Sequence, residues 1–379
     1  MLADTRRAHA SFAWRDAAAG DPLIGDWEAL LNDDALDVGG VHVSYLDVDG
    51  LRATEYQLDL DVWPDRRLRL TQLGRRFDTF VEELRRLRNR SRVAGLLAHG
   101  ITMPLVFDGA WIGLQGEPRG RIDALQLQRA ELQVYDTHLT MVPVDGDPRQ
   151  LPFGAMRDIR LWDNDPAIVV SGDAQCVVLG QLGRQREALF AAIVDRREAQ
   201  RKFLTALTGA TGFSDGWGVT RTQVTNMDHL MERFTAPSRV DSCRTIVELA
   251  GGDVRFGFVQ LLDPDSDGQE IGGLPDPWAS FLLATVRDLT VLEILSGASA
   301  ATYVFRGAIE DINRDLQLLH FRRAPLALSA DEAIITPANP FRLALRRLVP
   351  LHRLRDAMVA RIVHREGWEQ SLRATCAGS

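Results

Sequence analysis

The four residues Gln72-Leu73-Gly74-Arg75 recur 109 residues further along the chain, counted from Gly74 to Gly183, as Gln181-Leu182-Gly183-Arg184. Each copy follows a segment with strand-like character, residues 67–71 in the first and 175–180 in the second. Each copy also precedes a pattern in which apolar residues recur every three or four positions, which is typical of an amphipathic helix. The same strand-turn-helix order at both places predicts an internal repeat.

The regions around the two copies agree with a repeat. Both helices run into arginines, which suit the negative end of a helix dipole. Strand-like segments lie upstream, at residues 56–62 and 167–170, and a turn at residues 145–148 predicts a hairpin before the second copy. Each copy therefore predicts several short antiparallel strands closed by one C-terminal helix. The apolar helix residues are Phe77, Phe80, Val81, Leu84 and Leu87 in the first copy and Leu189, Phe190, Ile193 and Val194 in the second.

This arrangement resembles the pleckstrin-homology-like (PH-like) fold, a strongly bent antiparallel sheet closed by one helix. The resemblance covers roughly residues 28–92 and 121–203, and it rests on element order and the short Gln-Leu-Gly-Arg motif. PH-like folds use sheet edges, loops and the C-terminal helix to bind peptides or phosphorylated lipids. The resemblance therefore implies one of these two classes of ligand.

A chain of 379 residues is too long for one ordinary core. We predict an α+β protein with PH-like domains at residues 1–100 and 101–205 and a further α+β domain at 206–379. The boundary before the last domain falls in the glycine-rich stretch 208–218. In the last domain the patterns predict helices at residues 223–234, 278–295, 309–319 and 341–365, strands at 245–249, 254–262, 302–305 and 324–329, and a hairpin turn at 251–253.

Composition argues against several classes of function. The formal net charge is −8, which opposes binding to nucleic acid. Lys202 is the single lysine among 44 basic residues, so a phosphate-binding G-x-x-x-x-G-K-[ST] loop is absent. The arginine bias is typical of a GC-rich bacterial genome. The three cysteines are scattered and form no C-x-x-C pair. The sequence also has no signal-peptide pattern and no transmembrane stretch. Together these features predict a bacterial cytoplasmic protein.

Three motifs that suggest catalysis or metal binding are each incomplete. Gly212–Gly216 matches G-x-S-x-G around Ser214 but follows a helical pattern instead of a buried strand. Asp263–Gly268 matches half of a calcium loop, whose twelfth position is Leu274 instead of glutamate. The histidines have no metal-ligand spacing. We therefore predict no catalytic residue, no metal site and no cofactor.

Arginines are the best candidates for binding residues, since guanidinium groups form paired hydrogen bonds with phosphate or carboxylate. The predicted function is a non-enzymatic binding or scaffold protein acting on a protein partner. One alternative is a small anionic ligand, phosphoinositide or anionic membrane surface. A second is a hydrolase that uses Ser214 or a cluster of His320, His352 and His364. The candidate binding residues are Arg75, Arg76, Arg184, Arg322, Arg323, Arg346 and Arg347.

Overall fold

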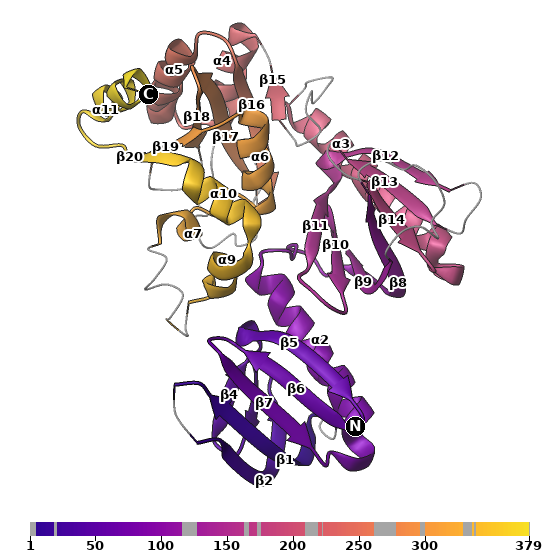
Figure 1. The fold of residues 1–379 in the computed structure, drawn as a ribbon. Coiled ribbons are helices and arrows are strands. Elements are labelled where there is room, and N and C mark those ends of the chain that lie inside the picture. Colours follow the sequence, from indigo (N-terminus) through magenta and orange to yellow (C-terminus); the bar gives the residue numbers. More distant parts are fainter. Residues whose placement is uncertain are drawn as a thin grey trace. The chain divides into compact units, whose positions relative to one another are not determined.

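The computed structural model of the chain describes residues 5–18, 21–115, 127–162, 167–172, 176–208, 219–221, 223–260, 278–295, 300–328, 336 and 339–378. This part is a mixed α+β protein with three antiparallel sheets, two of seven strands and one of six (Figure 1). Two compact units make up the chain. The first comprises Met1–Ala98, Asp145–Pro148 and Ser329–Arg347, and the second comprises His99–Val144, Arg149–Leu328 and Leu348–Ser379.

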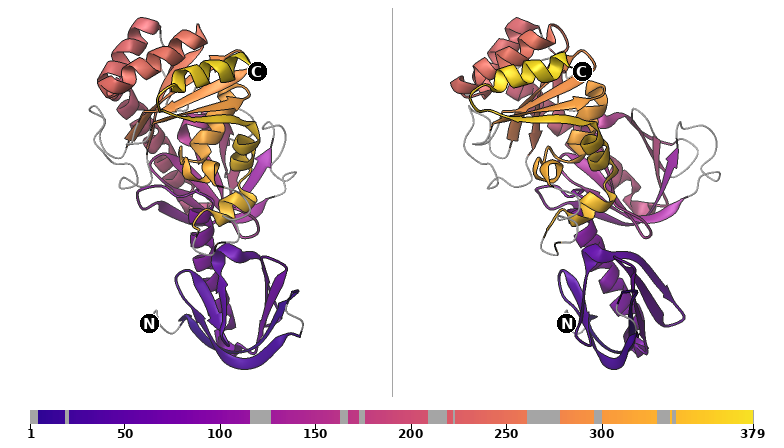
Figure 2. Two further views of the ribbon diagram at one scale, coloured as in Figure 1. Left: turned by 90° about the vertical axis from the view of Figure 1, so that its left-hand side faces the viewer. Right: turned by 60° about the vertical axis from the view of Figure 1, so that its left-hand side comes forward.

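The first sheet belongs to the first unit, and its strand order is β4-β3-β2-β1-β7-β6-β5. Strand β1 pairs with both β2 and β7. Strands β2 to β4 therefore lie on one side of β1, and strands β7 to β5 lie on its other side. The sheet is strongly curled (Figure 2). Helix α2, Phe77–Gly95, follows the last strand. The strands are β1 Arg7–Asp16, β2 Leu23–Leu31, β3 Ala35–Val38, β4 Val41–Ser44, β5 Val48–Thr54, β6 Gln57–Val62 and β7 Arg66–Thr71.

Alternation along these strands explains the core of the first sheet. In β6, Leu58 and Leu60 point inward and are fully buried, while Asp59 and Asp61 alternate with them. The apolar face of α2 packs on the same core, with Phe80 among its fully buried residues. Each such side chain contributes about 2 kcal/mol of burial free energy. We call β1–β7 with α2 the first sheet–helix domain.

The second sheet–helix domain has the same topology and lies in the second unit. Its strand order is β11-β10-β9-β8-β14-β13-β12, in which β8 pairs with both β9 and β14. Helix α3, Arg186–Thr208, follows the last strand. The strands are β8 Leu105–Gln115, β9 Gln128–Val134, β10 His138–Pro143, β11 Arg149–Pro152, β12 Met156–Leu161, β13 Ile168–Gly172 and β14 Cys176–Gly180.

The repeated Gln-Leu-Gly-Arg segment forms the same strand-to-helix turn in both domains. Gln72 and Gly74 have φ angles of 60° and 57°, and Gln181 and Gly183 have angles of 53° and 52°. The 3-10 helices η2, Gly74–Arg76, and η5, Gly183–Gln185, then lead into α2 and α3. The sequence match therefore encodes one unusual backbone conformation twice, since left-handed φ angles favour glycine.

The two sheets extend further toward the N-terminus than the segments from residues 28 and 121 on which the PH-like resemblance rests, because they begin at β1 and β8. Strand β1 presents Ala8 and Ala10 to the core, which gives a weak apolar signal. Strand β8 contains an irregularity between Phe107 and Ala110, where Gly109 has a φ angle of 74°. This irregularity breaks the period of two that reveals a strand.

The third sheet lies in the second unit, in the order β15-β16-β17-β18-β19-β20. Buried residues of α4, α5 and α11 share one core with its strands. The ring of Phe321, just after α6, stacks on Phe281 of β17 at 4.1 Å. The strands are β15 Val219–Arg221, β16 Val254–Gln260, β17 Trp278–Val286, β18 Leu289–Ile294, β19 Ala301–Arg306 and β20 Met358–Val363. The helices are α4 Val224–Phe234, α5 Pro237–Ala250, α6 Ile309–Leu318, α7 Ala324–Ala327, α10 Val349–Ala357 and α11 Trp368–Ala377, and the short α9, Arg342–Arg347, lies in the first unit.

Several sequence predictions in this region are wrong. Residues 278–295 form the β17–β18 hairpin instead of a helix. Residues 245–249 belong to helix α5 instead of a strand. Residues 251–253 begin with the left-handed C-cap of that helix at Gly251, so they do not form a hairpin turn. Strand β18 is buried at every position, so it carries no alternation that would distinguish a strand from a buried helix.

Two further predictions fail near the C-terminus. Residues 324–329 begin with helix α7 instead of a strand. The predicted helix 341–365 divides into α9, α10 and strand β20. Strand β20 alternates between half-buried and exposed residues and pairs with β19, so its β-branched side chains lie on a pleated surface. No helix in the described ranges is long and apolar enough to cross a membrane.

Candidate binding sites

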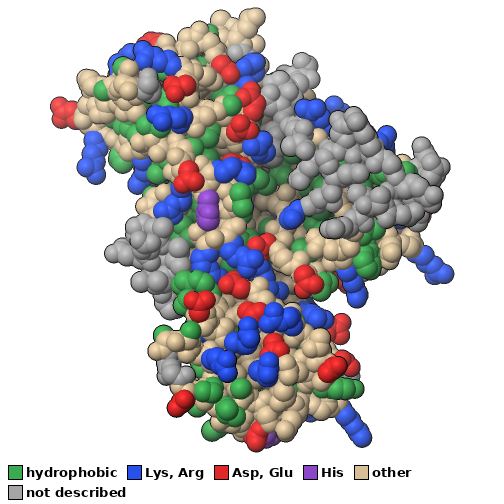
Figure 3. All heavy atoms as spheres, in the orientation of Figure 1, with side chains coloured by type: hydrophobic (Ala, Val, Ile, Leu, Met, Phe, Trp, Pro, Cys, Tyr) green, Lys and Arg blue, Asp and Glu red, His purple; other side chains and the backbone are tan. Residues whose placement is uncertain are grey.

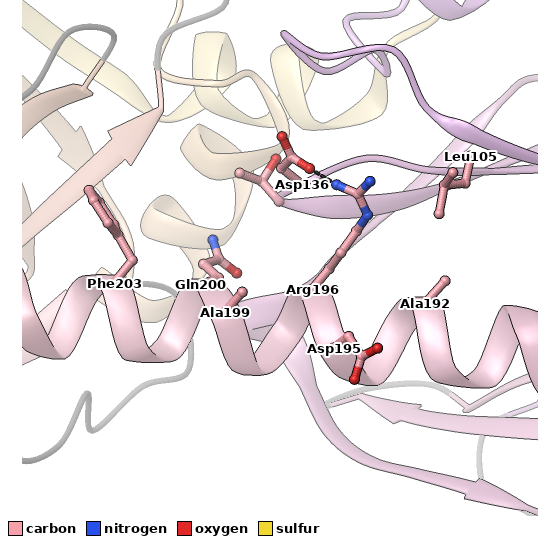
Figure 4. A pocket seen from close by; sticks show the side chains of 9 residues that line it. Leu105, Asp136, Ala192, Asp195, Arg196, Ala199, Gln200 and Phe203 are labelled. Carbon is pink, nitrogen blue, oxygen red and sulfur yellow. Dashed lines mark ion pairs between the residues drawn. The ribbon is translucent and has the colours of Figure 1, made fainter.

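A cavity of about 520 Å³ lies beside α3 in the second sheet–helix domain (Figure 4). One wall is the face of α3 that carries Ala192, Arg196 and Phe203, and the other includes Leu105 and Asp136. The small side chain of Ala192 leaves space along the helix. Phe203 and Leu105 are 37% and 46% exposed and offer apolar contact surface. The volume falls within the range of sites that bind small ligands.

One ion pair crosses this cavity. Arg196 contacts the carboxylate of Asp136 (Figure 4), which also accepts a hydrogen bond of 2.8 Å from Thr102 Oγ1. Both charged side chains are partly exposed, so the pair contributes at most about 1 kcal/mol of stability. None of the residues lining the cavity is a cysteine, serine or histidine. The lining offers apolar contact surface, carboxylates and the hydroxyl of Thr137.

The first half of β2, residues 23–28, is an exposed apolar strand edge, which we call the β2 edge. Strand β1 pairs with residues 23–30 of β2, whereas β3 pairs only with residues 29–31. Within the described residues no strand covers the other side of the β2 edge. Leu23, Ile24 and Trp27 are 50%, 70% and 58% exposed. An open apolar edge of this kind is a template for another strand.

A third candidate lies in the first unit, where five arginines and three aspartates form the arginine cluster. Helix α2 supplies Arg88 and Arg92, and both are buried. Arg92 contacts Asp147, which lies in the 145–148 segment of the same unit. Arg88 donates to the backbone oxygens of Val48 and Asp49 at 3.3 and 3.2 Å.

Helix α9 supplies the other three arginines of this cluster. Arg342 donates to Asp47 at 3.1 Å and to Ser44 Oγ at 2.7 Å. Arg346 pairs with Asp49 at 3.4 Å, and its guanidinium lies over the Trp63 ring at 4.6 Å.

Arg347 connects the two halves of the arginine cluster. It pairs with Asp49 and with Asp147, each at 3.0 Å. Burial lowers the pKa values of Arg88, Arg92 and Arg346, because a guanidinium loses hydration inside the protein.

Of the arginines predicted to bind, only Arg346 and Arg347 lie in this cluster. Arg75 and Arg76 lie in η2, before α2 begins. Because α2 has 19 residues and is about 28 Å long, most of this helix separates Arg75 and Arg76 from the arginine cluster. Arg76 instead donates to the backbone oxygen of Arg7 at 2.9 Å.

The other predicted arginines belong to the second unit, and no described contact brings them into a common site. Arg184 lies exposed in η5. Arg322 and Arg323 are half-buried between α6 and α7, and both make contacts there.

The cluster residues that sequence reasoning missed did leave a signal. Arg88 and Arg92 follow Leu84 at four-residue spacing, so they stand on the apolar face of α2, where a solvated arginine does not belong. Asp147 had no comparable signal, because an aspartate in a turn is ordinary.

The histidines of the hydrolase alternative have different neighbours. His320 Nε2 lies 2.8 Å from Gln150 Nε2. His364 Nε2 lies 2.8 Å from Thr302 Oγ1 and 3.4 Å from the buried carboxylate of Glu293. His352 is exposed on α10. Among the described residues, no group of three or more His, Cys, Asp or Glu side chains is arranged to hold a metal. Ser214 and the Asp263–Gly268 segment lie outside the described ranges.

No protein-family model matches the chain. A search of curated proteins also finds no significant match.

Proposed function

We propose that this chain is a non-enzymatic, cytoplasmic bacterial scaffold protein whose PH-like domains hold a segment of a protein partner. The proposed domains are residues 1–100, 101–205 and 206–379. The strand order, with the first strand between the second and seventh and a helix after the last, supports the PH-like assignment. Three buried free cysteines are compatible with a reducing compartment.

The β2 edge is the observation that carries this proposal. The backbone N–H and C=O groups on one side of residues 23–28 have no strand partner among the described residues, so a partner strand would extend the sheet. Leu23 and Trp27 lie on the same face of β2 and together form an apolar surface for alternate side chains. An exposed apolar edge that stays uncovered promotes aggregation, which favours a permanent or frequent occupant.

The occupant is an extended protein segment with alternating apolar and basic residues. Apolar side chains would contact Leu23 and Trp27. Basic side chains would lie opposite Asp26 and Glu28, both exposed on the other face of β2. Opposite charges on neighbouring strands favour pairing.

Ion pairs on the sheet weaken the membrane alternative. Arg67 pairs with Asp61 at 3.0 Å, and Arg69 pairs with Asp59 at 2.7 Å. Figure 3 shows blue and red side chains intermingled over the first sheet. Paired arginines leave less free positive charge for an anionic surface.

The test is capture of partners from lysate of the native host by the full chain and two variants. Wild type and the control Met103→Ser, which alters a side chain 89% exposed in the other unit, should capture the same protein in stoichiometric amount. The double variant Leu23→Ser, Trp27→Ser should lose at least about tenfold of that capture at an unchanged melting temperature. Equal capture by all three proteins would contradict the proposal. In the full chain, a photo-crosslinking residue placed at Ile24 should label an extended segment of the captured partner.

A further inference from the structure

The arginine cluster carries more positive than negative charge. Arg88, Arg92, Arg342, Arg346 and Arg347 contribute five positive charges. Asp47, Asp49 and Asp147 contribute three negative charges, which leaves an excess of two among the described residues. Unbalanced charge is costly where side chains are buried, and here Arg92, Arg342 and Arg346 are each at most 8% exposed.

The same cluster contains hydrogen-bond donors without acceptors. Nε and Nη1 of Arg92 and Nη1 of Arg346 are buried and have no hydrogen-bond partner among the described residues. The carboxylate of Asp47 lies 3.7 Å from Arg346 Nη1, beyond hydrogen-bond distance. Buried guanidinium donors nearly always find an acceptor, because a buried donor left unpaired has lost its hydration without compensation.

We infer that the arginine cluster is a binding site for a phosphate-like oxyanion. A dianion would balance the two excess charges, and its oxygens accept several hydrogen bonds from fork-shaped guanidinium groups. The site draws on α2, α9, the β4–β5 region and the 145–148 segment, so the anion would also fasten these parts of the first unit together. The inference does not depend on the β2 edge.

The route to the site passes Arg347. Its side chain is 30% exposed, and those of its partners Asp49 and Asp147 are 39% and 29% exposed. An anion can therefore reach Arg347 from solvent, and Arg347 shares Asp147 with Arg92 and Asp49 with Arg346. A small free anion suits this depth better than a headgroup held in a membrane.

The experiment titrates inorganic phosphate into the full chain at constant ionic strength, with sodium chloride as the balancing salt. Calorimetry should detect saturable binding, and the melting temperature should rise with phosphate. Arg346→Gln should weaken binding by about tenfold or more, since a charge-assisted hydrogen bond is lost. Arg75→Gln removes the same charge from an exposed position and should bind like wild type. If Arg346→Gln does not fold, the more exposed Arg347→Gln replaces it.

Two results would overturn the inference. The first is a phosphate effect no larger than that of chloride. The second is equal affinity in the Arg346→Gln and Arg75→Gln variants. A parallel co-sedimentation with phosphatidylcholine vesicles containing a phosphoinositide distinguishes the source of the phosphate group. Sedimentation that requires Arg346 and resists competition by free phosphate would replace the free anion with a lipid headgroup. No such sedimentation is expected.

Discussion

Arg88 and Arg197 make the same contact in the two sheet–helix domains. Arg88 Nε donates to Val48 O at 3.3 Å, and Arg197 Nη2 donates to Met156 O at 2.8 Å. The two arginines are 109 positions apart, the same offset as the repeated turn. Each fastens the C-terminal helix to the start of the fifth strand, where the pairing register shifts.

Removing this contact should destabilise each domain to a different degree. Arg88→Met leaves the backbone oxygens of Val48 and Asp49 without this donor and should lower the free energy of unfolding by about 2 kcal/mol. Arg197→Met should cost about 1 kcal/mol, because Arg197 is half-buried and solvent can replace it. Urea unfolding followed by circular dichroism measures both. Arg201→Gln, at a side chain 72% exposed, is the control and should change little. An Arg88→Met midpoint equal to that of the control would refute the contact's importance.

The repeated turn predicts a matched pair of glycine effects. Gly74 and Gly183 have left-handed φ angles, and a Cβ at either position would have open space around it. Gly74→Ala or Gly183→Ala should therefore cost about 1 kcal/mol through backbone strain alone. Gly252→Ala is the control, because Gly252 has open space and an ordinary φ angle. Thermal unfolding should separate the two turn variants from the control. Three equal melting temperatures would show that the turn can relax.

Glu83 links the stability of the first unit to acid pH. The hydrogen bond from Arg86 holds the pKa of Glu83 below its ordinary value of 4.5; burial opposes this, and Arg6 adds to it. A carboxyl whose folded pKa is depressed contributes stability above its unfolded pKa and loses it as pH falls. The difference in stability between wild type and Glu83→Gln should therefore be full at pH 7 and should shrink below about pH 4.5. A difference that stays constant down to pH 3 would exclude this ionic contribution.

The sequence was sufficient to predict the repeat because its turn needs unusual backbone angles at fixed positions. Glycine suits these left-handed angles at Gly74 and Gly183, and the glutamines Gln72 and Gln181 adopt them as well. The third sheet was harder to predict, because strand β18 is buried on both faces and has lost its alternation. Local pattern cannot separate such a strand from a buried helix.

The candidate sites were predicted only in part for a related reason. Arg346 and Arg347 could be selected because arginines crowd one short helix. Their partners Asp49 and Asp147 come from segments about 300 and 200 residues away, and tertiary folding alone brings them together. The β2 edge depends on where β3 ends, which sequence alone does not specify.

The thiols provide a final prediction about the second and third sheets. Cys176, Cys243 and Cys376 form no disulfide and are at most 3% exposed, and burial raises the pKa of each. Thiolate is the reactive form, so none of the three should react with Ellman's reagent in the native protein at pH 8. All three should react after unfolding in urea. Labelling at intermediate urea, with mass spectrometry to locate the modified cysteine, reports whether the second sheet, which holds Cys176, or the third-sheet core, which holds Cys243 and Cys376, opens first. Rapid native labelling of Cys243, a fully buried residue of α5, would contradict the packing of that helix on the third sheet.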